Sequence, residues 1–130
     1  AWNGNIICST RFAQVVESVQ SSAIQRIPVA IVSNDRQRVI YESGFEILNV
    51  IDVVEALDFQ ASIIEYYNPP IHDHIDNAIK MIVKIVLKPE KAQGHHLFRL
   101  RESRSHLLVS DQLRAALKSS NLTGVKFTKL

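Results

Sequence analysis

The stretch that decides the fold is the last third of the chain, which reads His95-His-Leu-Phe-Arg-Leu-Arg101, then Leu107-Leu-Val-Ser-Asp-Gln-Leu-Arg-Ala-Ala-Leu117, then Leu122-Thr-Gly-Val-Lys-Phe127. In the first piece His96, Phe98 and Leu100 alternate with two arginines, and this period of two is typical of a half-buried strand. We therefore expect the apolar side chains to face the core and the arginines at 99 and 101 to face solvent.

A helix is expected directly after the second apolar piece. Ser110 interrupts the run, and a Ser hydroxyl at a helix start can accept a hydrogen bond from an otherwise unpaired backbone amide. Asp111 suits the positive end of the helix dipole, and apolar residues then recur at helical spacing. Asn121 suits the left-handed conformation that ends many helices. Val125–Phe127 is expected to form a final strand.

The start of the chain repeats this pattern. Ile6–Phe12 contains an apolar pair followed by Ser9, and an apolar stripe continues at Val15, Val16 and Val19. The pattern predicts a second Ser-capped helix near the N-terminus. Two copies are too few for a solenoid, and Ser caps are common between strands and helices.

Between the two helices the sequence predicts strands. Ile24–Val32 contains Pro28, which has no backbone donor, so this strand is expected at a sheet edge. Turn residues at 34–36 lead to a partner strand at Arg38–Tyr41. Phe45–Leu57 fits both helical and alternating patterns. Its many Val and Ile residues favour a strand, which we expect to turn helical towards its end.

Ile79–Leu87 is the clearest strand, because every second residue from Ile79 is apolar. A turn at residues 89–94 predicts a hairpin in which this strand pairs with His96–Leu100. The outer face of the hairpin would then carry four cations that could bind an anion. These residues are Lys80, Lys84, Arg99 and Arg101.

Together these elements predict an α+β fold with a mainly antiparallel sheet and two Ser-capped helices near the N- and C-terminal ends. The 130 residues, 46% of them hydrophobic, suit one domain over residues 1–130. No apolar run approaches the roughly 18 residues of a membrane span. Cys8 is the only cysteine, so no intrachain disulfide can form, and the reducing cytoplasm is the expected location. A start at Ala1 is compatible with an upstream segment.

Charge is distributed unevenly along the chain. The net charge is only +2, so we do not expect a nucleic-acid partner. Residues 41–78 nevertheless contain eight acidic residues and no Lys or Arg. Five of these acids are expected to form a negative patch that attracts a basic partner. They are Glu42, Glu46, Asp52, Glu55 and Asp58. The alternative is that they neutralise the protein's own cations.

Few residues suggest catalysis. His72 and His74 flank Asp73, and these are good metal-ligand types, but no further ligand completes a site, so a solvated loop is the expected state. Cys8 lies in an apolar run and is expected to fill the core. The sequence has no nucleotide-binding glycine motif and no nucleophile elbow. We therefore expect neither an enzyme nor a cofactor.

The chain resembles a known family. Phe98-Arg99, the Leu-Val-Ser-Asp-x-Leu-x-x-Ala-Leu segment that begins at Leu108, and Leu122-Thr-Gly-Val-x-Phe127 are similar to the signature of a bacterial immunity-protein family. The segments Ile47–Val50 and Leu57–Ser62 also resemble that family. Its members accompany polymorphic toxins, so the resemblance implies a small protein that binds and neutralises a partner toxin.

The sequence thus favours a binding protein that covers the active site of a cognate toxin. Two alternatives stay open. One is a phosphate- or nucleic-acid-binding module that uses the basic hairpin face, and the other is a metal-dependent enzyme at His72 and His74. Neither the identity of the toxin nor the oligomeric state follows from the sequence.

Overall fold

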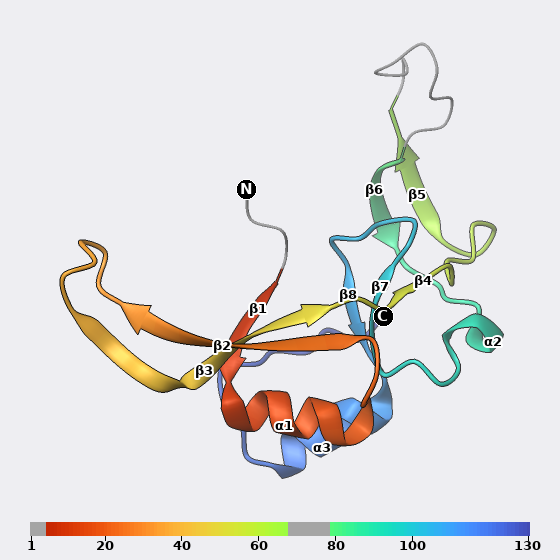
Figure 1. Cartoon of the computed structure of the whole chain (residues 1–130). Coiled ribbons are helices and arrows are strands. Elements are labelled where there is room, and N and C mark those ends of the chain that lie inside the picture. The colour runs from red at the N-terminus through yellow and green to blue at the C-terminus, as the bar shows by residue number, and fades with distance from the viewer. Residues whose placement is uncertain (1–4, 68–78) are drawn as a thin grey trace.

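The structure, a computed structural model, describes residues 5–67 and 79–130. In this part of the chain the strands are β1 (Ile6–Ser9), β2 (Ile24–Val32), β3 (Val39–Val50), β4 (Val53–Val54), β5 (Ile63–Tyr66), β6 (Ile79–Lys84), β7 (Leu97–Leu100) and β8 (Leu107–Val109). The helices are α1 (Thr10–Val19), α2 (Pro89–Ala92) and α3 (Asp111–Ser119). The N- and C-terminal helices and all three strands of the first sheet appear in Figure 1.

The strands form three small sheets. The first has the order β1-β3-β2 and is antiparallel, with β2 at one edge as Pro28 predicts. The second has the order β4-β7-β8, in which β4 runs parallel to β7 and β8 runs antiparallel to it. The third is the antiparallel hairpin β5-β6. The fold is therefore α+β with mostly antiparallel pairing, and the parallel β4–β7 pair was not predicted.

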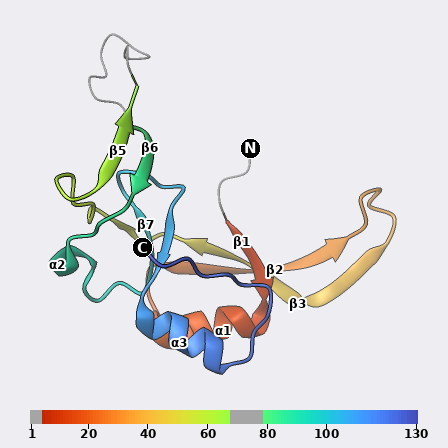
Figure 2. The same ribbon diagram turned by 180° about the vertical axis from the view of Figure 1, so that it is seen from behind.

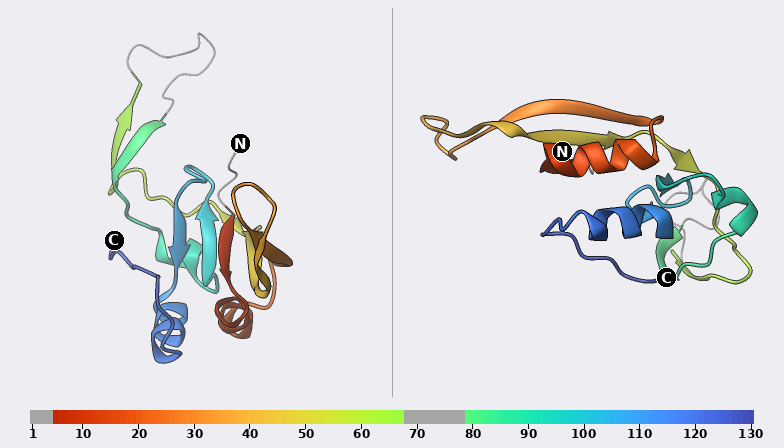
Figure 3. Two further views of the ribbon diagram at one scale, coloured as in Figure 1. Left: turned by 90° about the vertical axis from the view of Figure 1, so that its left-hand side faces the viewer. Right: turned by 90° about the horizontal axis from the view of Figure 1, so that it is seen from below.

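Two long helices follow strands through the same local geometry. The hydroxyl oxygen of Ser9 accepts a hydrogen bond from the amide of Phe12 at 3.1 Å, and that of Ser110 accepts one from the amide of Leu113, also at 3.1 Å. Each bond satisfies an amide that the helix itself leaves unpaired. The two helices lie side by side on the same side of the strands, as the end-on view in Figure 3 shows. Asn121 has a φ of 54°, the left-handed conformation expected after α3.

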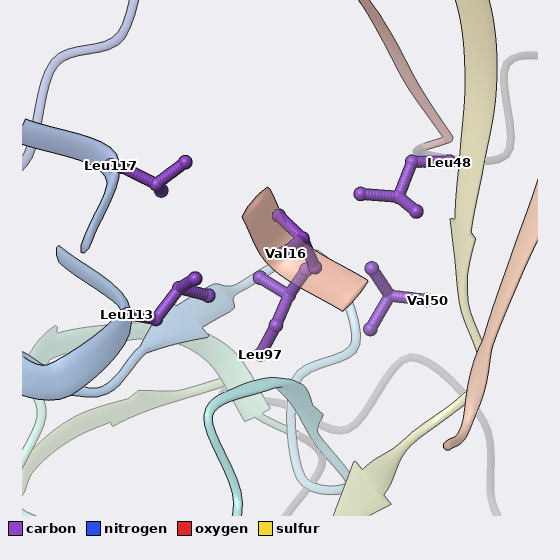
Figure 4. Packing of buried hydrophobic residues seen from close by; sticks show 6 residues of the cluster. All are labelled: Val16, Leu48, Val50, Leu97, Leu113 and Leu117. Atoms are coloured by element: carbon purple, nitrogen blue, oxygen red, sulfur yellow. The ribbon is translucent and has the colours of Figure 1, made fainter. Parts of the chain in front are cut away.

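Buried apolar residues form two clusters that meet at β7. Leu97 packs into the first cluster with residues of α1, β3 and α3, which Figure 4 shows converging from opposite sides: Val16, Leu48, Val50, Leu113 and Leu117. The next residue, Phe98, packs with Leu100 into a second cluster around β4 and β6. Because both faces of β7 are covered, all four of its residues are buried. The sequence-based prediction of a half-buried strand was wrong for this reason.

The side chain of Gln20 joins the end of α1 to the start of β7. Its oxygen accepts hydrogen bonds from the amides of His96 and Leu97, each at 2.8 Å, and its nitrogen donates to the carbonyl of Leu97 at 2.8 Å. On this edge of β7, the strand β4 pairs only from Arg99 onwards. The Gln20 amide, which is only 7% exposed, therefore completes the edge where no strand lies.

The predicted hairpin between residues 79–87 and 96–100 is wrong. Strand β6 pairs instead with β5, a segment for which the sequence predicted no regular structure. The face of β6 that is buried carries Ile82, whereas Met81 and Val83 are exposed. The hydroxyl of Ser62 exchanges hydrogen bonds with the backbone of Val86 and thereby fixes the two segments together. Alternation alone did not show which face of this apolar strand the core would cover.

Two further predictions differ from the structure. Val125–Phe127 is irregular, although Phe127 still packs against the first apolar cluster. The long segment predicted at Phe45–Leu57 ends as β3 at Val50 and resumes as the short strand β4, with no helical turn. The chain bends here because the amides of residues 51 and 52 both donate to the carbonyl of Ala23.

Two hairpins project from the body in different directions (Figures 1 and 2). One is the outer part of β2 and β3 with their connecting turn, residues 29–45, which we call the β2–β3 arm. Its strands depart from regular pairing between Val29 and Ile31, close to Gly44, whose φ of 94° favours glycine. The other projection is the β5–β6 hairpin.

We expect replacement of Gln20 by Met, which keeps the length but removes the amide, to lower the free energy of unfolding by about 3 kcal/mol, because three backbone groups, those of Leu97 buried and that of His96 partly buried, lose their hydrogen bonds. Urea denaturation followed by circular dichroism measures this change. Gln112→Met, on the exposed side of α3, is the matched control and should change the free energy by less than about 0.5 kcal/mol. Equal effects of the two substitutions on the free energy of unfolding would contradict a stabilising role of the Gln20 hydrogen bonds.

Candidate partner-binding site

Glu46, one of the five predicted partner-binding acids, is buried in β3. Its carboxylate accepts two hydrogen bonds from the guanidinium of Arg26, from Nε at 2.9 Å and from Nη2 at 2.8 Å. Arg26 also lies 3.4 Å from a carboxylate oxygen of Glu17 at the surface. The hydrogen bonds from Arg26 hold the pKa of Glu46 below its ordinary value. Glu46 is therefore committed to an internal ion pair.

Three other acids also have partners within the chain. An oxygen of Asp52 lies 2.6 Å from Nδ1 of His95. Glu55 forms an exposed ion pair with Arg101 at 3.2 Å. Asp58 accepts hydrogen bonds from two backbone amides of the turn that follows it. Within the described residues, Glu42 is thus the one of the five acids whose carboxylate forms neither an ion pair nor a hydrogen bond to the backbone of a turn.

Glu42 and Glu46 both line a cavity of about 480 Å³ at the base of the β2–β3 arm, which we call the root cavity. Its lining comes from α1, β2 and β3 and consists of Thr10, Arg26, Pro28, Val29, Ala30, Glu42, Ser43, Gly44, Phe45 and Glu46. Glu55 lines a different cavity, of about 550 Å³, together with His95 and Glu102. Of the five predicted acids, Glu42 and Glu46 therefore line one cavity and Glu55 lines another.

The four predicted anion-binding cations do not form one face. Lys80 lies on β6 and pairs with Glu65 at 3.2 Å, while Arg99 lies on β7 in another sheet. Arg99 is 8% exposed and donates to the carbonyl of Arg104 at 3.1 Å. Arg101 pairs with Glu55. Because β6 pairs with β5, and β7 with β4 and β8, the hairpin that was expected to carry Lys80, Lys84, Arg99 and Arg101 on one face does not form.

Sequence reasoning missed the exposed apolar side chains of the two projections. On the β2–β3 arm, Val39 is 55% and Tyr41 is 52% exposed, and their neighbours Val32 and Ile40 are exposed as well. On the β5–β6 hairpin the exposed apolar residues are Ile63, Tyr66, Met81 and Val83. The unequal lengths of the strands could have signalled the arm, because β1 is too short to cover the whole of β3.

Metal chemistry gains no support from the described residues. His72 and His74 lie outside them, and within residues 5–67 and 79–130 no group of three or more His, Cys, Asp or Glu side chains could hold an ion. Cys8 packs against the first apolar cluster, as expected of a core filler. Burial, aided by the negative charge of Glu46, raises the pKa of its thiol to about 11.

These features describe a small α+β protein with exposed projections and with several of its charges paired internally. Residues 1–130 match the model of the Immunity protein family (Imm11). The chain belongs to this immunity protein family of polymorphic toxin systems. No curated protein matches the chain. Among the described residues no helix is long and apolar enough to cross a membrane.

The raised pKa of Cys8 predicts slow thiol chemistry. At pH 8 the thiolate fraction should be about two orders of magnitude below that of an ordinary cysteine, because only the thiolate reacts. Reaction with a chromogenic disulfide reagent should therefore be slow in the folded protein and fast in urea. A fast reaction of the folded protein would contradict the burial of Cys8.

The ion pair of Glu46 predicts a specific cost and pH dependence. Glu46→Ala should lower the free energy of unfolding by about 2 kcal/mol, because it leaves the Arg26 guanidinium without its bidentate partner. Since the folded pKa of Glu46 is lowered, its contribution is fully present above the unfolded pKa and is lost as the pH falls through the lower folded pKa. The variant should thus lose less stability on acidification than the wild type, as urea titrations at several pH values would measure.

Glu55→Ala removes a carboxylate from an exposed ion pair and is the matched control. Its effect should stay within about 0.5 kcal/mol. A Glu46 variant with as small an effect, or with unchanged acid sensitivity, would contradict the assignment.

Proposed function

We propose that this protein binds a cognate toxin and neutralises it by covering the toxin's active site. The observation that carries the proposal is the family match, which extends over residues 1–130. Immunity proteins of polymorphic toxin systems act on a partner protein, and this chain offers exposed apolar side chains on elements that stand away from its body. Occlusion requires a surface of about 800 Å² on each partner, which projecting hairpins can extend.

The proposal gives the protein a binding role without chemistry of its own. The buried ion pair between Arg26 and Glu46 fits this role, because it holds an acid of the middle segment within the fold. The proposal places the protein in the bacterial cytoplasm, where an unpaired Cys8 stays reduced and where a toxin would threaten the producing cell. It involves neither a cofactor nor a membrane.

The proposal predicts stoichiometric inhibition of the toxin encoded beside this protein's gene. The toxin and the full chain should co-purify, and a titration of toxin activity should break at one equivalent of this protein, because covering a site consumes one molecule per toxin. Size-exclusion chromatography with light scattering should give the mass of a complex.

Two results would contradict the proposal. The first is undiminished toxin activity at a large excess of this protein. The second is complete inactivation by far less than one equivalent, because a substoichiometric effect would mean that the protein acts as a catalyst on the toxin.

A further inference from the structure

Resting on the proposed function, the geometry points to the β2–β3 arm as the surface that grips the toxin. We propose that the root cavity receives a basic side chain of the toxin next to Glu42, that the apolar side chains of the arm pack against the toxin, and that the arginines at the tip face acidic groups. The toxin is thus expected to carry a basic residue and an acidic surface on the two sides of an apolar contact.

The arm lacks a cover within the described structure. Strand β1 pairs with β3 only between Phe45 and Leu48, so the outer edge of β3 from Val39 to Gly44 has no neighbouring strand among the described residues. A hairpin of two strands is marginally stable alone in water. The arm projects from the body (Figure 1), so a partner protein that packs against it would stabilise it.

Apolar side chains from both strands line the arm in pairs. Val29 lies opposite Phe45, and Ile31 lies opposite Tyr41, so each pair shares one side of the hairpin. The rings of Tyr41 and Phe45 connect the pairs, with centroids 5.0 Å apart. Exposed tyrosine and arginine are the residues most enriched at the energetic centres of protein interfaces. The apolar surface is thus continuous from the root cavity towards the tip.

The charges of the arm follow a definite order. At the tip, Arg36 and Arg38 are exposed and make no ion pair within the described residues, whereas the carboxylate of Asp35 accepts hydrogen bonds from the Ser33 hydroxyl and the Gln37 amide inside the turn. At the base of the arm, the guanidinium of Arg26 forms ion pairs with both Glu46 and Glu17.

Glu42 at the rim of the root cavity therefore adds negative charge that no cation of the described chain neutralises. A basic residue of the partner would find there a carboxylate and an apolar wall formed by Val29 and Phe45. Opposite charges at the two ends of the arm also fix the direction in which the toxin can dock, because the reversed orientation would bring like charges together.

The β5–β6 hairpin is the matched comparison. Its exposed residues Met81 and Val83 resemble those of the arm in size and exposure. However, its charged residues Lys80 and Glu65 pair with each other at 3.2 Å, which leaves Lys84 as the remaining charge of strands β5 and β6, whereas the arm carries charges of both signs at its two ends.

Binding of the purified toxin to full-length variants, measured by calorimetry at two salt concentrations, tests the inference. Val39→Ser with Ile40→Ser should weaken binding at least about tenfold, because a central apolar contact is lost. Glu42→Lys should weaken it by a similar factor, and Arg36→Glu with Arg38→Glu should slow association and alter its salt dependence. Met81→Ser with Val83→Ser is the control and should change the affinity less than about threefold. Circular dichroism verifies that each variant is folded.

The outcomes separate this inference from the proposed function. If the wild type inhibits the toxin but every arm variant binds as tightly, the toxin binds elsewhere and the inference fails while the function stands. If the wild type does not bind the toxin, both fail. A wild-type dimer that the arm variants convert to monomers would make the arm a contact between copies of this chain and would also overturn it. The charge variants, placed on exposed side chains, decide the matter if the apolar variant does not fold.

Discussion

The arrangement of the whole molecule depends on the side-chain amide of Gln20. One edge of β7 is covered by β8, and the other is covered partly by β4. The backbone at the start of β7 would have no partner on this edge without an amide that both donates and accepts, and Gln20 supplies it from the end of α1. An unpaired backbone group in such a buried place is costly. A contact between residues that are 77 positions apart therefore joins the end of α1 to the second sheet.

This connection explains why the projections stay free. With α1 held against β7, both apolar clusters close around that strand, and the sheet residues nearest to it are buried. The outer half of β3 lies beyond the reach of β1, α1 and β7, so its apolar side chains remain in water. The ion pair between Arg26 and Glu46 lies at the base of the arm, between the buried and the exposed parts of this hairpin. A rigid body with an uncovered arm is a suitable shape for a protein that works by covering a partner.

Local signals in the sequence predicted local structure well. The residues around Ser9 and Ser110 indicated both long helices, and Pro28 indicated an edge strand, because each of these signals acts within a few residues of backbone. Strand partners were harder, since β6 is apolar on both faces and either face could have been the buried one. The partner of β6 was missed because the turn after Asp58, which returns the chain into β5, is built from hydrogen bonds that the composition of the segment does not reveal. The same limit applies to the candidate site. Clustering of acids in the sequence could not show that Glu46 faces the guanidinium of Arg26 and Asp52 the ring of His95, both from other segments.

The central claim is that a body fixed through Gln20 presents the β2–β3 arm to a toxin. Amide hydrogen exchange, measured by mass spectrometry with and without the toxin, tests it most directly, because it reports which backbone segments a partner covers. On toxin binding, slower exchange is expected at residues 29–45 and at the other residues that line the root cavity and have a backbone amide, Thr10, Arg26 and Glu46, with β5–β6 and α3 unchanged. Protection of β5–β6 or α3, with residues 29–45 exchanging as in the free protein, would contradict it.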